Sequence, residues 1–420
     1  MNNQQAERAG NVVGKNHGDV AIENKSSIIK YLRRSGVCSR AQIAQAVGLT
    51  QASISKIIAQ LKSEGIVFET GFIAGAKGRR SVGVALNTMC KRVLGVRLSR
   101  RSFAVGLFDL SGKMYENVSG QFSATTTLRS VIIRIKEILR DFLARYEDIA
   151  AIGVAVPGPF NVKTAEIALT TSMATSDWTN VRLREEFGED LPVKVVFCHD
   201  AIAGALANWW FGSKVDKFRS SLVHFLVGDG VGAGFIENGE VHENAMGFST
   251  EMGHVSVDVD GPLCACGNRG CLELYCSTFA FLDDVNQRLA RPEGAGSVLA
   301  RLSGVTVQDV FTAAAAGDPL AMEAVDRVGR YIGYGVVNLI NIYAPDVVVV
   351  SNEMAKGGRQ ILDRVREVVR ERVLPATAES VAVELEDEWL LGDPVLFGAG
   401  AVAINYCLED PMILLGSGMA

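Results

Sequence analysis

The sequence predicts an α/β protein in which a small helical N-terminal domain precedes a larger two-lobed α/β domain. Two observations lead to this prediction. From residue 92 onward, stretches typical of buried strands alternate with amphipathic helical stretches, in two successive groups. The chain also has 420 residues and 43 glycines, which suits several domains rich in tight strand–helix turns.

Charge is distributed unevenly along the chain. Residues 1–91 hold 13 Lys and Arg against 5 Asp and Glu, whereas the remaining residues hold 29 against 42. We call residues 1–91 the basic head and the remaining residues the acidic body. This uneven charge is typical of a protein whose basic part binds nucleic acid. The first 27 residues are polar, and no uninterrupted apolar run is long enough to span a bilayer. We therefore expect a cytoplasmic protein without membrane insertion, whose eight cysteines are free thiols or metal ligands.

The basic head contains a helix-turn-helix pattern. Ser39 and Gln42 form a capping box that opens a short helix, and Thr50 caps a second helix that Gly65 ends. The preceding segment carries Ile28, Ile29 and Leu32 on one helical face. The apolar residues of the second helix also share a face: Ile54, Ile57, Ile58 and Leu61.

A basic segment, GAKGRRS, lies between two predicted strands and is interpreted as a wing. The candidate DNA contacts are basic or small hydrogen-bonding residues: Arg40, Gln51, Ser53, Ser55, Lys56, Lys77, Arg79 and Arg80. An ordinary helical hairpin with solvated arginines is the alternative. The third helix, the wing and the basic charge together favour a winged helix-turn-helix over residues 21–88 that binds a double-stranded DNA operator, after a disordered tail over residues 1–20.

The acidic body is predicted from its apolar periodicity. A long helix is expected from about residue 126 to 146, with its buried stripe at Leu128, Val131, Ile132, Ile135, Leu139 and Phe142. The other expected elements are two strands within 92–114, a strand near 149–156, a strand and helix within 192–212, a hairpin within 221–241, helices near 277–290, 306–315 and 318–343, and a strand near 346–352. The two groups of elements indicate two lobes with a cleft between them.

Three thiols and an imidazole fall within a short stretch of this body. Tetrahedral zinc takes four Cys or His ligands, and this stretch supplies four: His254, Cys264, Cys266 and Cys271. Gly267 and Gly270 allow the chain to fold tightly around a metal. Because every ligand would come from the protein, we expect a closed, structural zinc site. A disulfide is the alternative, which a reducing compartment disfavours.

The segment EMGHVSVDVDGPLCACGNRGCLE, residues 251–273, resembles the signature of the ROK family of repressors, open reading frames and sugar kinases. The resemblance extends over the whole chain. It implies a winged helix followed by a two-lobed actin-like (ribonuclease H-like) ATPase-type domain over residues 92–420, with 251–273 as its zinc loop. Family members with a winged helix are sugar-responsive repressors, similar to those for xylose, glucose and N-acetylglucosamine, whereas those without one are mostly ATP-dependent sugar kinases.

The resemblance also implies a set of sugar-binding residues: Gly158, His199, Asp200, Glu251, His254 and Glu273. The kinases have Asn-Asp where this chain has His199-Asp200, so the aspartate that acts as general base is kept. His254 would be both a metal ligand and a sugar contact. The chain departs from the family pattern near Thr175, which suggests an altered sugar preference or a phosphorylated or larger ligand. The alternative is that Asp200 and Glu251 merely cap helices.

The nucleotide-binding elements of the kinases are altered in this chain. Arg97, Ser99, Arg100 and Arg101 stand where the kinases place residues that let the backbone approach phosphates. In the second phosphate loop Asp229 replaces a threonine, and SNEMAKGG replaces a later run of glycines. We therefore expect no useful ATP binding and no kinase activity.

These observations predict a DNA-binding regulator of a carbohydrate uptake or catabolism operon, by family default a repressor, whose effector is a sugar or sugar phosphate. A homodimer or homotetramer is expected, because paired half-sites need paired winged helices. One alternative is a bifunctional sugar kinase. The other is a regulator that senses a protein partner, such as a transporter domain.

Overall fold

The computed structural model describes the chain in nine segments: residues 17–74, 80–122, 126–167, 181–187, 191–214, 220–242, 247, 249–390 and 392–415. The chain divides into two compact units, and each is considered by itself. The first unit comprises Met1–Lys91 and Asn405–Ala420, and the second comprises Arg92–Ile404.

Three helices and a small sheet form the first unit. Its elements are α1 (His17–Ser35), β1 (Cys38–Ser39), α2 (Arg40–Val47), α3 (Gln51–Ser63), β2 (Val67–Ala74) and β3 (Arg80–Leu86), with strand order β1-β3-β2. The capping box of Ser39 and Gln42 is confirmed, as is the cap of α3 by Thr50. Ile28, Ile29 and Ile54 are fully buried, so the apolar faces read from the sequence form the core of a winged helix-turn-helix.

Two boundaries of this unit differ from those expected. α1 begins at His17, inside the segment expected to be a disordered tail, while residues 1–16 lie outside the described residues. The last turns of the C-terminal helix α13 (Pro394–Glu409) group with this unit rather than with the body. Lys30 of α1 lies 3.7 Å from Glu409, and Leu408 and Leu414 are buried. The C-terminal segment therefore supplies apolar contacts that local sequence did not indicate.

The second unit contains two five-stranded sheets. The first sheet has the order β11-β7-β4-β5-β6, formed by β4 (Arg92–Leu98), β5 (Ser102–Asp109), β6 (Met114–Gln121), β7 (Ile149–Val156) and β11 (Lys194–His199). α4 (Leu128–Arg145) packs on one face through the predicted stripe, whose six residues are all buried. Short elements complete this lobe: β8 (Phe160–Asn161), β9 (Glu166–Ile167), β10 (Val181–Arg182) and α5 (Leu183–Phe187).

The second sheet repeats the arrangement of the first, with the order β14-β13-β12-β15-β16. Its strands are β12 (Ser221–Val227), β13 (Val231–Glu237), β14 (Glu240–Val241), β15 (Val347–Ser351) and β16 (Ala382–Leu385). In both sheets an antiparallel meander of three strands is followed by two strands parallel to its first strand. The chain therefore builds the same α/β lobe twice, which is the actin-like arrangement expected from the resemblance.

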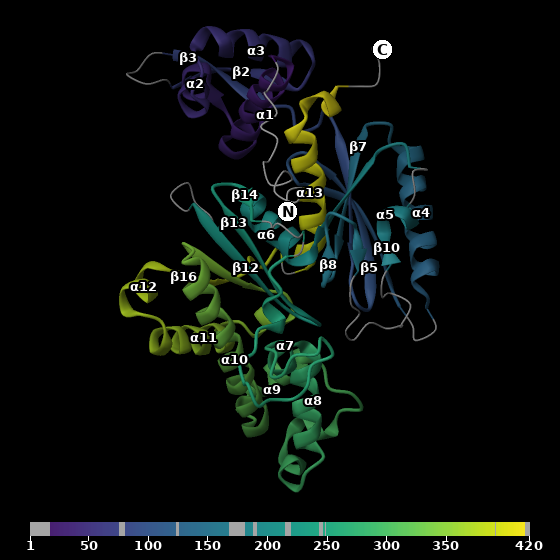
Figure 1. The fold of residues 1–420 in the computed structure, drawn as a ribbon, viewed down its shortest axis with the longest axis vertical. Coiled ribbons are helices and arrows are strands. Elements are labelled where there is room, and N and C mark those ends of the chain that lie inside the picture. The colour runs from purple at the N-terminus through teal and green to yellow at the C-terminus, as the bar shows by residue number, and fades with distance from the viewer. Residues whose placement is uncertain are drawn as a thin grey trace, which may run out of the picture. The chain divides into compact units, whose positions relative to one another are not determined.

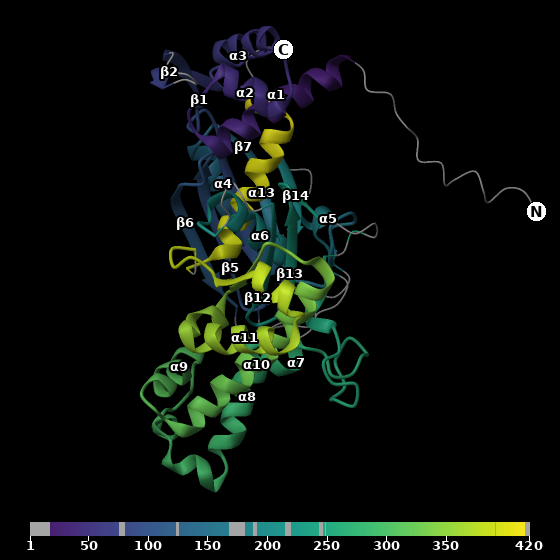
Figure 2. The same ribbon diagram turned by 90° about the vertical axis from the view of Figure 1, so that its left-hand side faces the viewer.

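Helices cover one face of the second sheet (Figure 2). α10 (Pro319–Tyr343) and α11 (Arg359–Arg372) lie against the sheet, and α12 (Pro375–Ser380) follows them in the chain. α7 (Glu273–Cys276), α8 (Thr278–Leu289) and α9 (Val307–Ala315) pack on α10, with α8 and α9 farther from the strands. β12 is buried along its whole length because it is covered on both faces: Val223 and Phe225 pack toward these helices, while Leu222 and Leu226 pack toward α6. No helix in the described segments is both long and apolar enough to cross a membrane.

α6 (Asp200–Phe211) and the first part of α13 lie between the two sheets (Figure 1). The approach is close enough to require glycine. A Cβ on Gly153 of β7 would lie 2.1 Å from the Ala399 carbonyl oxygen, and one on Gly398 would lie 2.1 Å from the Ala203 carbonyl oxygen. This packing brings the end of β11 and the start of α6 beside the β12–β13 hairpin, where the candidate site forms.

Candidate functional site

All six predicted sugar-binding residues line one cavity of the second unit, with a volume of about 310 Å³. They come from the turn after β7, the β11–α6 junction, the segment around η3 (Met252–His254) and the start of α7. Gly158 leaves room for His199, because a Cβ there would lie 2.2 Å from Nε2 of that imidazole. The structure thus brings together residues that are up to 115 positions apart in the chain, from Gly158 to Glu273.

His199 and Asp200 lie where a buried parallel strand passes into a helix. The Ala201 backbone N–H donates to Oδ1 of Asp200 at 2.7 Å and to Nδ1 of His199 at 3.2 Å. Nδ1 of His199 also lies 3.1 Å from Oδ1 of Asp200, so these two side chains and the Ala201 backbone N–H form one local cluster. Burial raises the pKa of Asp200, while the neighbouring His199 and Arg100 oppose this shift. His199 is the N-cap of α6, and Asp200, its first residue, also accepts from the first turn, so the capping role weighed for Asp200 from the sequence applies in addition to any ligand role.

Glu251 behaves differently from a capping residue. It precedes η3, yet its side chain makes no capping hydrogen bond. Its Oε1 is buried and has no hydrogen-bond partner among the described residues. Burial raises the pKa of this carboxyl group, and the nearby His199 and His254 oppose the shift. A buried acceptor without a partner is costly, so this oxygen calls for a donor from outside the protein.

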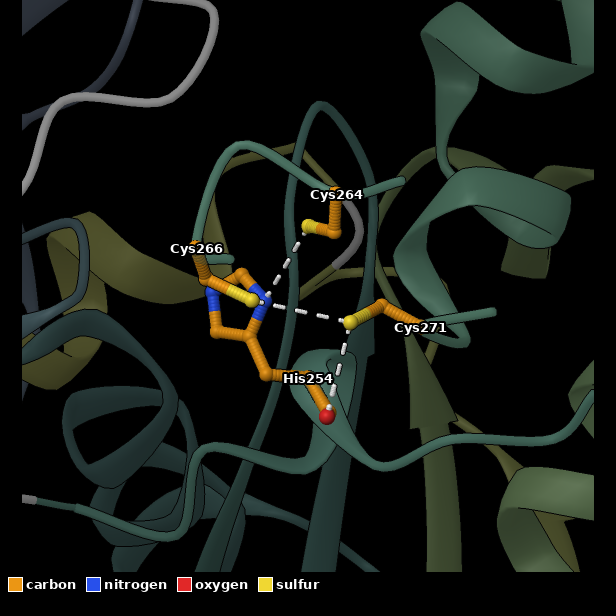
Figure 3. Close-up of side chains that lie close together, drawn as sticks. All are labelled: His254, Cys264, Cys266 and Cys271. Atoms are coloured by element: carbon orange, nitrogen blue, oxygen red, sulfur yellow. Dashed lines mark hydrogen bonds between the residues drawn. The ribbon is translucent and has the colours of Figure 1, made fainter. Parts of the chain in front are cut away.

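The Cys and His residues of the zinc loop converge in space (Figure 3). One ligand atom from each of the four lies within 4.8 Å of all the others. Nδ1 of His254 is 3.8 Å from Sγ of Cys264, and Sγ of Cys266 is 3.6 Å from Sγ of Cys271. The four can hold a tetrahedral metal ion, and the donor set is the one that zinc prefers.

Two features of the loop affect metal binding, one in its favour and one against it. Gly270 adopts a φ of +61°, and a Cβ there would lie only 1.7 Å from the Asp258 carbonyl oxygen, so the tight fold requires glycine. Burial, followed by hydrogen bonds with its neighbouring thiols, raises the pKa of Cys271 to about 12. Since metal ligands are thiolates, a bound cation would have to displace this proton.

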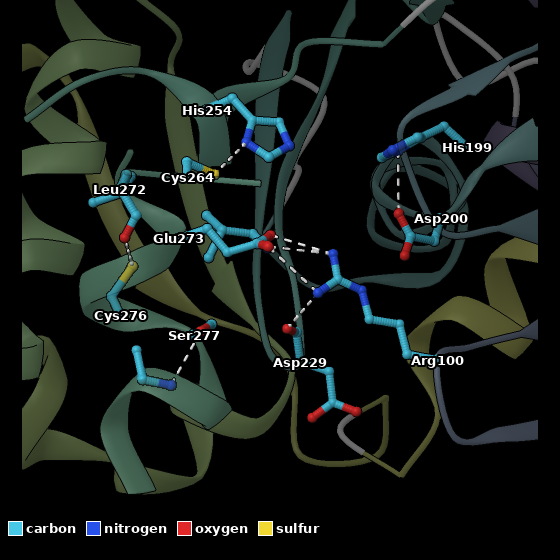
Figure 4. Close-up of polar contacts among 12 residues, drawn as sticks. Arg100, His199, Asp200, Asp229, His254, Cys264, Leu272, Glu273, Cys276 and Ser277 are labelled. Atoms are coloured by element: carbon cyan, nitrogen blue, oxygen red, sulfur yellow. Dashed lines mark hydrogen bonds and ion pairs between the residues drawn. The ribbon is translucent and has the colours of Figure 1, made fainter. Parts of the chain in front are cut away.

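Opposite the zinc loop, three arginines make contacts that the sequence did not indicate. Nε of Arg97 lies 2.8 Å from Oδ2 of Asp393, just before α13. The Arg100 guanidinium is buried, donates to the Asp229 carbonyl oxygen at 2.9 Å and lies 3.4 Å from the Glu273 carboxylate (Figure 4). Arg101 is more exposed and lies over the Phe279 ring, with its Cζ 4.0 Å from the ring centroid.

The altered glycine loops lie at this end of the cavity as well. A Cβ on Gly230 would meet the Arg100 guanidinium at 2.8 Å, so the arginine fills the space in front of that glycine. Asn352 adopts a φ of 70° with a ψ of −151°, a region that is essentially confined to glycine, so its backbone is strained. Asn352, Glu353 and Asp393 line the cavity, although no motif in the sequence had singled out Asp393.

The predicted DNA-contacting residues belong to the first unit. Gln51, Ser55 and Lys56 are exposed on α3, and Arg80 is exposed at the start of β3. The Ser53 hydroxyl lies 2.9 Å from Oγ1 of Thr50 within the helix cap. Arg40 forms an ion pair with Glu69 at 2.8 Å. Lys77 and Arg79, like the segment around Thr175, lie outside the described residues.

Comparison with known proteins identifies both units. Residues 93–405 match the ROK family, and residues 23–67 match a winged helix-turn-helix DNA-binding family. The chain is 28% identical to the xylose repressor of Caldicellulosiruptor bescii, over 94% of this chain and 99% of the repressor. It is 30% identical to the DNA-binding transcriptional dual regulator NagC of Escherichia coli, over 86% and 87% of the two chains.

Solved structures agree on the fold. A ROK family transcriptional regulator described as a homolog of the E. coli MLC protein superposes with a TM-score of 0.77 at 24% identity, covering 95% of this chain and 99% of the regulator. A ROK family glucokinase from Streptomyces griseus, in complex with glucose and AMPPNP, superposes with a TM-score of 0.65 at 25% identity, covering 74% of this chain and 99% of the kinase. The chain therefore belongs to the ROK family and carries a winged helix-turn-helix DNA-binding domain at its N-terminus.

Proposed function

We propose that this protein is a transcriptional repressor of genes for sugar uptake or catabolism, which binds a sugar in the cavity described above and does not phosphorylate it. One observation carries the proposal: a single chain joins a winged helix to a cavity lined by carboxylates and imidazoles. Relatives of nearly the same length that are named xylose repressor and N-acetylglucosamine repressor support it.

The proposed sugar side of the cavity consists of Asp200, Glu251, His254 and Glu273, supported by His199 and Gly158. Carboxylates accept hydrogen bonds from hydroxyl groups, and the unpartnered Oε1 of Glu251 suits this role. Because Nδ1 of His254 faces the thiols, its Nε2 is left for the cavity. Glu273 accepts a 3.0 Å hydrogen bond from the Val231 backbone, which fixes the position of its carboxylate.

Zinc is the metal that we propose for the cluster of His254, Cys264, Cys266 and Cys271. Three thiolates and one imidazole make a closed site, so its role is structural. The ion would hold the loop that carries Glu251 at one end and Glu273 at the other. Three of the proposed sugar-binding groups would then depend on one metal.

The proposed nucleotide side comprises Arg97, Arg100, Arg101 and Asp229. Arg100 lies in front of Gly230, and Asp229 adds a negative charge where phosphates would have to approach. The protein's own arginines therefore fill the space that a nucleotide would need, which supports the proposed loss of kinase activity.

The two-unit organisation suggests how the protein would bind its operator and how a sugar would release it from the DNA. A dimer places two α3 helices in successive major grooves, roughly 34–36 Å apart. Sugar binding that shifts one lobe against the other would change this spacing and weaken operator binding.

The test is fluorescence anisotropy with promoter DNA from the gene's own neighbourhood, with and without xylose, glucose or N-acetylglucosamine. We expect nanomolar binding that one of these sugars weakens at least about tenfold. Lys56→Ala should weaken binding and lower the salt slope by about one, because one phosphate contact is lost. Arg129→Ala, an exposed change on α4, is the matched control. Binding that no sugar alters would favour a protein partner as the sensed ligand.

A sugar kinase is the second candidate, because Asp200 lies in the cavity at the position of a general base. A coupled assay for sugar-dependent ADP formation separates the two. We expect no turnover above background. Steady turnover that Asp200→Asn abolishes would contradict the proposal.

A further inference from the structure

One carboxylate of the winged helix-turn-helix lies between two cations. Glu69 belongs to β2, Arg40 is the first residue of α2, and Lys62 lies in the last turn of α3. Nη2 of Arg40 donates to Oε1 of Glu69 at 2.8 Å, and Nζ of Lys62 donates to Oε2 of the same carboxylate. Each oxygen of Glu69 therefore holds one cation, and the two cations come from different helices.

An irregularity in the sheet lies directly beside Glu69. Glu69 is opposite Val84 of β3 and Gly71 is opposite Gly83, so Thr70 is an extra residue in β2. Gly71 has a φ of +88°, which favours glycine. Bulges of this kind change the direction of a nearby side chain. The Glu69 carboxylate accordingly reaches two helices and not a neighbouring strand.

Both cations adjoin the surface that is proposed to contact DNA. In a helix-turn-helix the first helix crosses the DNA backbone, and Arg40 is exposed to solvent at the start of that helix. Lys62 follows Gln51 by eleven residues and Ser55 by seven, so these three residues share one side of α3. Gln51 and Ser55 are exposed and were predicted to contact DNA. The bridge formed by Glu69 therefore lies where phosphates would approach.

Glu69 neutralises part of the positive charge at this place. Hydrogen bonds from Lys62 and Arg40 hold the pKa of Glu69 below its usual range, so the carboxylate is charged at neutral pH. The three side chains together carry a charge of about +1, whereas the two cations alone would carry about +2. A carboxylate and a phosphate are both anionic acceptors for the same N–H groups. A DNA phosphate must therefore compete with Glu69 for Arg40 and Lys62.

The bridge is weak enough for DNA to open it. The Arg40 side chain is 31% exposed and the Lys62 side chain is 50% exposed. Ion pairs at such exposed positions stabilise a fold only slightly. Duplex DNA carries one negative charge for about every 1.7 Å of its axis, which is a far denser array of anions than one carboxylate. Binding to DNA would thus exchange Glu69 for phosphate.

We propose, on the basis of the DNA-binding function proposed above, that Glu69 is a positioning residue that acts through Arg40 and Lys62. It holds the two cations in the free protein and releases them to backbone phosphates in the complex. Because the exchange involves the DNA backbone and no base, Glu69 lowers the affinity for DNA of every sequence and makes binding less dependent on salt.

Fluorescence anisotropy on the full chain tests this with Glu69→Gln, which removes the charge and keeps the size of the side chain. The probes are a random-sequence duplex and a promoter duplex of equal length, each at several salt concentrations. We expect the Kd to fall at least about threefold on both duplexes. The slope of log K against log salt should steepen by about one, because one further phosphate is neutralised.

Glu237→Gln is the matched control, because it makes the same change of charge at an exposed position of β13 in the second unit. It should alter neither the Kd nor the slope. Thermal unfolding should show that Glu69→Gln remains folded, since the carboxylate lies at the surface.

A multiple variant shows whether Glu69 acts through its two partners. In a protein that carries Arg40→Ala and Lys62→Ala, the further change Glu69→Gln should improve the affinity less than about twofold, because no cation remains to be released. An undiminished gain in this background would overturn the inference, since Glu69 would then act only as a negative charge on the surface.

The other outcomes separate this inference from the function on which it rests. If a folded Glu69→Gln protein binds both duplexes more weakly, Glu69 holds its partners in place for contact, and the inference is overturned. An unchanged Kd and slope overturn it as well, and both results leave DNA binding intact. If neither the wild type nor the variant binds either duplex, DNA binding itself is wrong and the inference is wrong with it.

Discussion

The cavity has two ends, the proposed sugar side and the proposed nucleotide side. They differ in whether their polar side chains already have hydrogen-bond or ion-pair partners within the protein. On the proposed sugar side Glu251 keeps a buried oxygen without a hydrogen-bond partner among the described residues, close to the His and Cys cluster that could hold a metal. On the nucleotide side every cavity arginine is engaged with a carboxylate or a backbone carbonyl. A ligand is therefore needed at one end, whereas the protein satisfies the other end by itself.

This difference is consistent with the proposed function, in which the cavity binds a sugar and no nucleotide. Arg100 extends from the turn between β4 and β5 to Glu273 at the start of α7, so it connects the first lobe to the second (Figure 4). A bound nucleotide makes such a connection only while it is present, whereas a side chain makes it permanently. We expect the remaining ligand, the sugar, to be the only small molecule that adjusts the cleft.

The largest expected effect on stability comes from removing the proposed zinc site beside the sugar side. Cys271→Ala removes a fully buried ligand, and the folding free energy that comes with the metal is lost. We expect a loss of more than about 4 kcal/mol in the free energy of unfolding, measured by urea denaturation, with zinc content by atomic absorption falling to background. The response to sugar should be lost as well.

Cys276→Ala is the matched control, because Cys276 is an equally buried thiol five residues beyond the cluster. It should retain one zinc ion per chain. A Cys271→Ala protein that binds sugar with wild-type affinity without zinc would show that the loop does not need the metal.

The next largest expected effect on stability comes from removing the arginine that fills the nucleotide side. Arg100→Ala leaves the Glu273 carboxylate buried without its cation, which typically costs about 3–5 kcal/mol. Thermal and urea unfolding measure this loss. Arg101→Ala, at a side chain that is 58% exposed, should cost only about 0–1 kcal/mol.

A double-variant cycle shows whether the pair is responsible. Arg100→Ala combined with Glu273→Gln removes the unpaired charge, so it should recover much of the stability lost in Arg100→Ala. If the two losses simply add, Arg100 stabilises the fold through packing, and its ion pair with Glu273 contributes little.

The smallest expected effect is a pH dependence of the free energy of unfolding that arises from Glu386. Glu386 accepts hydrogen bonds from Ser351 and from Asn208, which also lies 3.1 Å from Nδ1 of the buried His224. Burial raises the pKa of Glu386 to about 7, with the hydrogen bonds from Ser351 and Asn208 opposing the shift. Burial lowers the pKa of His224 to about 3, so it is neutral in this range.

The sign follows from the raised pKa. The folded state binds the Glu386 proton more tightly than the unfolded state, so this contribution is fully present below about pH 4.5 and is lost as pH rises through about 7. Glu386→Gln should therefore gain stability relative to the wild type as pH rises, by at most about 1.4 kcal/mol per pH unit. Urea unfolding between pH 5 and pH 8 measures the difference. Parallel stability curves for the two proteins would contradict the shifted pKa.

Much of the fold and of the proposed site could be predicted because the signals were local or periodic. The capping box at Ser39, the buried stripe of α4 and the ligand spacing of the zinc loop each depend on residues a few positions apart. The elements that were not predicted include β6, α11, β16 and α13. α11 does carry a periodic signal, since Ile361, Val365, Val368 and Val369 share one buried helical face. β6 is largely exposed and lacks a clear apolar alternation, and the last turns of α13 group with a unit that is remote in sequence.

The sequence by itself determined the winged helix, the repeated α/β pattern and the His/Cys cluster that could hold a metal, because local hydrogen bonding and side-chain spacing are sufficient for these. Only the tertiary structure decided what the arginines at positions 97, 100 and 101 do. Arg100 and Glu273 are 173 residues apart, and they meet because the two sheets pack around α6 and α13. Long-range pairing of charges depends on that packing, which no local pattern records.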